Sequence, residues 1–123
     1  MAETKKERLI DILKDLRTSE IEGSMIVARD GLEVASDLIE EGFDRDSFAA
    51  MSAAMQGAAE TAMYELKQGE INQIIVDAKK GRIISVSSGK KTILVALIKP
   101  EGNLGLVLIE LEKAAEKIGG ILE

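Results

Sequence analysis

The feature that most limits how this chain can fold is a long uncharged stretch in its middle. Residues 47–59 carry no charged side chain and consist mainly of alanine, methionine and glycine. Apolar residues recur there at helical spacing, which predicts a helix that runs to about Lys67. One side of this helix can dock on a sheet, and it consists of Phe48, Met51, Met55, Ala58 or Ala59, Ala62 and Leu66.

The opposite side of this helix should face water, yet its residues are small and uncharged. A helix that is apolar all round is normally buried all round, and small side chains let another helix approach closely. A chain of 123 residues has little else with which to cover this side, so we infer a protein partner. The competing interpretation is an alanine-rich helix, favoured by propensity, whose outer face tolerates water. The side in question carries Ala50, Ser52, Ala53, Ala54, Gly57 and Thr61.

The strand predicted over residues 71–78 indicates the same partner. Its interior contains no Pro, Gly or Lys, the residues that usually discourage pairing at the edge of a sheet. If it lies at the edge, it can pair with its own copy and form a two-fold homodimer with one continuous sheet. The alternative is that this strand is interior and the edge lies elsewhere.

The remaining elements follow from their periodicities. Asp-Gly at residues 30–31 is typical of a tight hairpin turn, and Asp44 or Asp46 and Asn103 are suitable helix N-caps. The last segment alternates at first like a strand, but its longer helical repeat favours a helix. The predicted order is α-β-β-α-β-β-β-α, with a polar, irregular segment at residues 37–46. Its other elements are a helix at 5–18, a hairpin at 24–36, strands at 71–78, 82–88 and 91–98, and a helix from 104 onward.

This order predicts an α/β fold of the α+β type, in which helices sandwich a five-stranded antiparallel sheet. The length fits a single domain, residues 1–123. The N-terminal residues do not resemble a secretory signal, and no apolar run reaches the ~20 residues that span a bilayer. We therefore expect a cytoplasmic protein.

Composition argues against several functions. The net charge of −6 opposes binding to a phosphate backbone, and only Phe43, Phe48 and Tyr64 could stack on bases. The chain has no Cys and no His, which removes thiol chemistry and the usual general base. We expect no enzyme activity, no cofactor, no metal site and no nucleic-acid partner.

Two motifs could suggest chemistry but favour simpler explanations. Residues 87–92 resemble the end of a phosphate-binding loop, but Ile84 stands where that motif needs Gly, and a strand follows instead of a helix. Basic residues at 79–82 and 90–91 lie in two turns predicted at opposite ends of the sheet, so they do not form one patch. Four carboxylates are candidate acids or bases without a fixed spacing: Asp30, Asp37, Asp77 and Glu110.

Three stretches in this order resemble the Roadblock family. They are the hairpin GSMIVARDGL, the helix AAMSAAMQGAAE and the sequence GNLGLV that leads the last helix. The family includes dynein light chains, subunits of lysosomal scaffolds and bacterial partners of a polarity GTPase. The resemblance implies a profilin-like sheet, and dimers joined through the second helix and third strand.

The resemblance also implies a non-catalytic role in regulating or scaffolding a small Ras-like GTPase. Alternatives are an adaptor subunit with no GTPase role, and a small-ligand sensor domain, which needs a concave apolar pocket with convergent polar groups. No direct membrane insertion is expected. The residues expected at the dimer interface are Ala50, Ala53, Ala54, Gly57, Ala58 and Thr61 on the helix and Asn72, Ile74 and Val76 on the strand.

Overall fold

The N-terminal helix is closed by a reciprocal cap. A computed structural model describes residues 3–18, 20–38 and 42–123, and its first element is α1 (Lys5–Leu16). The Thr4 hydroxyl accepts a hydrogen bond from the Glu7 amide, and the Glu7 carboxylate accepts one from the Thr4 amide. Leu9, Leu13 and Leu16 form the buried side of this helix.

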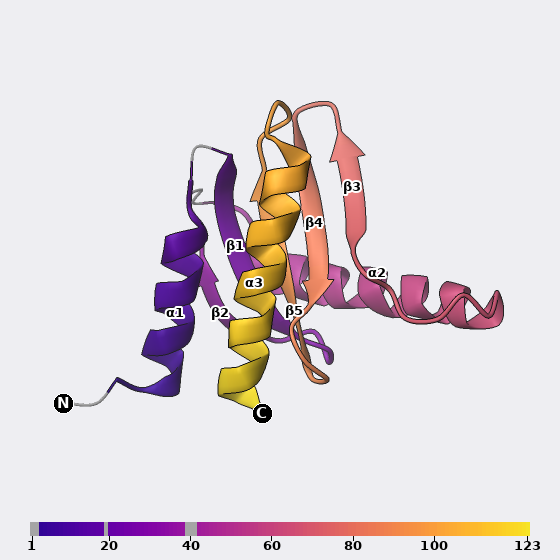
Figure 1. Cartoon of the computed structure of the whole chain (residues 1–123), viewed down its shortest axis with the longest axis horizontal. Coiled ribbons are helices and arrows are strands. Elements are labelled where there is room, and N and C mark those ends of the chain that lie inside the picture. The colour runs from indigo at the N-terminus through magenta and orange to yellow at the C-terminus, as the bar shows by residue number, and fades with distance from the viewer. Residues whose placement is uncertain (1–2, 19, 39–41) are drawn as a thin grey trace.

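Five strands form one antiparallel sheet in the spatial order β2-β1-β5-β4-β3. A tight turn joins the first two strands, in which Gly31 has a φ of 97° and the Asp30 carboxylate accepts the Leu32 amide. The turns β3–β4 and β4–β5 lie at opposite ends of the sheet (Figure 1). The strands are β1 (Ile21–Ala28), β2 (Glu33–Asp37), β3 (Ile74–Ala78), β4 (Gly81–Ser87) and β5 (Thr92–Ile98).

The helices divide unequally between the two faces of the sheet. Figure 1 shows α1 and α3 (Leu104–Leu122) side by side on one face, while α2 (Arg45–Glu65) crosses the other face and extends beyond β3. The side chains of Asp44 and Asn103 cap α2 and α3 by accepting the amides of Ser47 and Leu106. Among the described residues, one face therefore has two covering helices and the other has one.

Each face has its own apolar core. The larger core joins α1 and α3 to alternate residues of the strands, including Ile26, Ile84 and Leu94. The smaller core lies under the N-terminal half of α2, and its buried members are Met25, Val27, Ala49, Ile93 and Val95. The alternation of these residues along β1 and β5 follows from the two-residue period of a strand.

The predicted element order and fold class are confirmed, and so is the position of β3 at an edge of the sheet. The limits of two strands differ from the prediction. Strand β1 begins at Ile21, three residues before the expected start, and β3 begins only at Ile74, because residues 71–73 lead to the sheet without joining it. Part of the irregular segment predicted at 37–46 lies outside the described residues.

Removing volume from the larger core should destabilise the subunit. Leu13 is completely buried, so Leu13→Ala should lower the free energy of unfolding by about 2–5 kcal/mol. Leu32 is 67% exposed, and Leu32→Ala should leave the unfolding midpoint nearly unchanged. Urea titration followed by circular dichroism measures both, and equal effects would contradict this description of the core.

Candidate protein-interaction surface

The side of α2 that packs on the sheet is not the predicted one. Ala49, Ser52 and Gln56 are buried against the strands, whereas Met51 and Leu66 of the predicted stripe are each 62% exposed. The prediction was wrong because an uncharged helix has no polar face to mark its outward direction. Of the predicted docking residues, Phe48 packs against the smaller core.

A buried hydrogen bond fixes the crossing point of α2. The Ser85 hydroxyl on β4 donates to the Gln56 side-chain oxygen at 2.9 Å, and both residues are at most 2% exposed. A buried polar group without a partner would cost roughly 1–3 kcal/mol, so each of these side chains requires the other. Sliding α2 along or across the sheet would break this pair.

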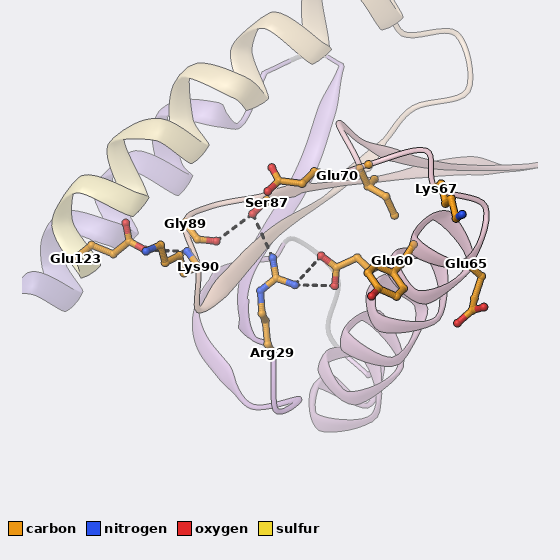
Figure 2. Close-up of a pocket in the computed structure, with 12 residues that line it drawn as sticks. Arg29, Glu60, Glu65, Lys67, Glu70, Ser87, Gly89, Lys90 and Glu123 are labelled. Carbon is orange, nitrogen blue, oxygen red and sulfur yellow. Dashed lines mark hydrogen bonds and ion pairs between the residues drawn. The ribbon is translucent and has the colours of Figure 1, made fainter.

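An ion pair fixes the next turn of the helix. Arg29, just after β1, donates to both carboxylate oxygens of Glu60 at 2.8 Å, and its other terminal nitrogen donates to the Ser87 hydroxyl at 3.3 Å (Figure 2). Both charged side chains remain about a third exposed, so this pair contributes modestly to stability. Its geometric effect is to connect α2 to two turns at one end of the sheet.

At its other end, α2 is held by Arg45. The Arg45 guanidinium donates to the Glu33 carboxylate and to the Ser36 hydroxyl on β2. The hydrogen bond and the charge of Glu33 raise the pKa of Arg45. These contacts join the first turn of α2 to the far edge of the sheet.

Beyond Gln56 the helix contacts its own sheet less, and Glu60 holds it through Arg29 at the end of β1. Its N-terminal half packs on β1, β2 and β5, and its C-terminal half projects past the β3 edge (Figure 1). Strand residues on the same face as Ser85 are therefore incompletely covered. Val76 is 39% exposed, and Ile74, Ile83 and Leu97 are only partly buried. We call Val76, Ile83 and Leu97, which lie side by side across β3, β4 and β5, the bare row.

The structure spreads the predicted interface residues over several parts of α2 and β3. Ala53 packs partly in the smaller core, and Ala50 lies against Gly31 of the β1–β2 turn. Of the strand set, Asn72 is exposed before β3 begins, Ile74 is partly buried and Val76 is exposed. Four helix positions are exposed: Ala54, Gly57, Ala58 and Thr61.

The exposed apolar residues of α2 and β3 that the sequence reasoning missed include Tyr64, Ile75 and Leu66. Tyr64 is 78% exposed, Ile75 is 40% exposed and Leu66 was expected on the sheet. The position of Tyr64 after the uncharged stretch, near the end of a helix longer than the sheet is wide, could have identified it.

The hollows on the α2 side of the described residues include a larger and a smaller one. The larger, about 1020 Å³, is lined by Arg29, Glu60, Tyr64 and the β4–β5 turn (Figure 2). The smaller, about 410 Å³, is bounded by Phe43, Phe48 and Leu97, with Glu22 and Lys99 as its charged members. The smaller one is apolar enough to hold a side chain or a small ligand.

The structure does not assemble the candidate catalytic residues. Asp37 pairs with Arg17, and Asp77 pairs with Arg82. Asp30 accepts a hydrogen bond from the Leu32 amide within the β1–β2 turn. Glu110 lies on α3, away from these strands. Among the described residues, no group of acidic side chains could hold a metal ion, and no helix is long and apolar enough to cross a membrane. The loop-like motif at 87–92 is the β4–β5 turn, which leads into a strand as expected.

Comparison with known proteins agrees with this architecture. The model of the Roadblock/LC7 domain family matches residues 10–98, and the chain belongs to this family. The uncharacterised protein MJ1340 of Methanocaldococcus jannaschii is 39% identical over 102 residues, which cover 83% of this chain and 88% of that protein.

Solved structures share the fold at low identity. MglB of Myxococcus xanthus superposes with a TM-score of 0.87 at 19% identity, covering 99% of this chain and 92% of that one. A profilin of Schizosaccharomyces pombe gives a TM-score of 0.64 at 20% identity, covering 96% of this chain and 98% of that one. The sheet is therefore profilin-like, as expected.

The two polar contacts under α2 should differ in energetic weight. Gln56→Ala leaves the buried Ser85 hydroxyl without its partner and should lower the free energy of unfolding by about 1–3 kcal/mol. Glu60→Ala removes a partly exposed ion pair and should cost less than about 1 kcal/mol. Urea unfolding of both variants measures the difference, and a larger loss for Glu60→Ala would refute this ranking.

Proposed function

We propose that this protein is a non-catalytic, homodimeric module that regulates or scaffolds a small Ras-like GTPase. The dimer rests on one observation: the C-terminal half of α2 projects beyond a sheet face that is itself incompletely covered. In two copies related by a two-fold axis at β3, each projecting helix covers the other subunit's bare row. Both the helix and the uncovered sheet face then gain a partner. The GTPase role rests on membership of the Roadblock family, whose members include such regulators.

The free edge of β3 supports the strand part of this seam. Within the described part of the chain, strand β3 pairs only with β4, and its residues 74–78 include no Pro, Gly or Lys to discourage another strand. Pairing β3 with its copy would produce one ten-stranded sheet from two five-stranded ones. Ile74 and Val76 would then lie beside the two-fold axis on the α2 side.

The helix part of the seam follows from the two flanks of α2. One flank, with Ala53, Gly57 and Glu60, adjoins Arg29. The other flank carries Phe48, which adjoins Leu97 of the bare row, and helical spacing places Met55, Ala59 and Leu66 on that same flank. A partner helix lying over the bare row would contact this second flank. We therefore propose Met55, Ala59 and Leu66 as the central helix contacts.

The outward face of α2 stays free in this arrangement. It lies opposite the buried residues Ala49, Ser52 and Gln56, and its exposed members are Met51, Ala54, Ala58 and Ala62. Two such faces, side by side on the dimer, form a largely apolar surface of the kind that marks a protein-binding site, with the exposed Glu65 at the end of each helix. We propose this surface as the docking site for the GTPase. The predicted residues Ala54 and Ala58 thereby belong to the partner surface.

The dimer can be tested by its mass. Light scattering at micromolar concentration should report about twice the monomer mass. Val76→Arg and Ala59→Arg each place a long charged side chain in the seam and should shift the protein toward monomer. A monomer at every accessible concentration of the unmodified chain would remove the dimer.

The GTPase role can be tested separately. A Ras-like GTPase from the same genome should co-purify with the protein or change its rate of nucleotide turnover when the protein is added. Ala54→Arg should abolish this effect while leaving the dimer mass unchanged, and Ala59→Arg is the matched variant that should lose both. If no such GTPase responds to the unmodified dimer, the regulatory proposal fails and an adaptor role is left.

A further inference from the structure

The small apolar hollow beside α2 has a composition that suggests an aromatic occupant with a polar tip. Phe43 and Phe48 form one wall, with their rings edge to face and their centroids 5.9 Å apart, and Leu97 contributes to the lining. Glu22 and Lys99 are its charged members. We call this hollow of about 410 Å³ the phenylalanine pocket.

The path of α2 over the sheet can be measured from its two fixed points. Ala49 belongs to the same buried cluster as Met25 and Val27 of β1, and Gln56 bonds to Ser85 of β4. Seven residues of helix advance ~10 Å. The step from β1 through β5 to β4 is two strand spacings, also ~10 Å. The helix therefore crosses the strands almost at a right angle.

The rest of the helix is long enough to reach well into a second subunit. From Gln56 to the end of α2 at Glu65 the axis advances ~14 Å, and β3 is reached after the first ~5 Å. In the proposed dimer, the next two strands along the continuous sheet are β3 and β4 of the second copy. The last turn of α2 then lies over β4 of that copy, one strand spacing from the phenylalanine pocket.

The strand registers determine where α2 of the second copy lies along the strand direction. Ile74, Ser85, Val95 and Met25 are in register, and Gln56 lies over this row. The bare row lies two residues further along the strands, a distance of ~7 Å. A two-fold axis between the two rows puts the second α2 over the bare row, close to the ~8–10 Å separation of packed helices.

Of the residues in the last turn, Tyr64 points in the required direction. It lines the same hollow as Arg29 and Glu60, so it lies on the flank of α2 away from Met55 and Ala59. After the two-fold rotation, this flank faces away from the helix-helix seam, toward Lys99 of the second copy. A tyrosine combines an apolar ring with a hydroxyl that can hydrogen-bond, which matches the apolar walls and charged members of the pocket.

We propose that the phenylalanine pocket of each subunit receives the side chain of Tyr64 from the other subunit. This inference rests on the proposed homodimer and adds a reciprocal aromatic contact at both ends of its helix pair. It explains why a 78% exposed tyrosine lies in the last turn of α2 and why an apolar pocket stays open in one subunit.

Nuclear magnetic resonance on a mixed dimer tests the contact directly. Equal amounts of carbon-13-labelled and unlabelled protein are combined, and Overhauser effects between subunits are selected by isotope filtering. Tyr64 is the only tyrosine, so its ring signals belong to one residue once they are distinguished from those of Phe43 and Phe48. Cross-peaks from this ring to the Leu97 methyl groups of the other subunit are expected. A stable dimer without them would overturn this contact and leave the dimer itself intact.

Dissociation constants provide the second test. Tyr64→Ala should weaken the dimer by about 30-fold or more, as expected for a buried aromatic anchor. Tyr64→Phe should weaken it less, and Leu32→Ala, at another exposed apolar residue, should have no effect. The double variant Tyr64→Ala/Leu97→Ala should raise the dissociation constant of the dimer by less than the product of the two single fold-changes, because both substitutions remove the same contact.

The outcomes distinguish a failure of the Tyr64 contact from a failure of the homodimer. Sedimentation equilibrium measures dissociation, and circular dichroism verifies that each variant is folded. Normal dimerisation of Tyr64→Ala would refute the contact alone, and so would a metabolite that binds the pocket of the intact dimer with Tyr64 in place. A chain that is monomeric before any substitution would refute both the contact and the dimer.

Discussion

The structure depends on how one helix is placed on one face of a five-stranded sheet. The other face is covered by α1 and α3, which pack side by side, but α2 alone serves this one. Because α2 crosses the strands almost at a right angle, it covers a single band, and the buried residues Met25, Val27, Ile93 and Val95 lie in that band. Apolar residues outside it, such as Val76, remain exposed. The crossing direction therefore creates both the uncovered surface and the projecting helix that can cover it in a second copy.

Polar side chains determine the direction in which α2 crosses the strands more than apolar side chains do. Alanine packs almost equally well in many orientations, so an alanine-rich helix could slide or rotate on the sheet at low cost. The Gln56–Ser85 hydrogen bond prevents this at the centre, since either side chain would otherwise be buried without a partner. The Arg29–Glu60 and Arg45–Glu33 pairs then align the two ends. A few polar contacts thus select one arrangement among several that are similarly favourable for apolar packing.

The sequence was sufficient to predict the element order and the sheet. It was insufficient to predict the rotation of α2 about its own axis, which decides the side that faces the sheet. Helices α1 and α3 have charged residues between their apolar ones, so their buried sides, such as Leu9 and Leu13, follow from spacing. In α2 the only cues were Gln56 and Ser52, and both were assigned outward or ignored because polar residues usually face water. Their burial depends on a partner 29 residues away, Ser85, which no local pattern reveals.

The rotation of α2 about its own axis determines how many partners this helix can contact. If the buried side had been the methionine stripe, α2 would have had only small residues left for a second contact. With Ala49, Ser52 and Gln56 inward, two further surfaces are available at right angles to each other. One is the flank with Met55 and Ala59, and the other is the outward face with Met51 and Ala54. A single helix can then pair with its own copy along one surface and bind a different protein along the other, so dimerisation would assemble the second binding surface without consuming it.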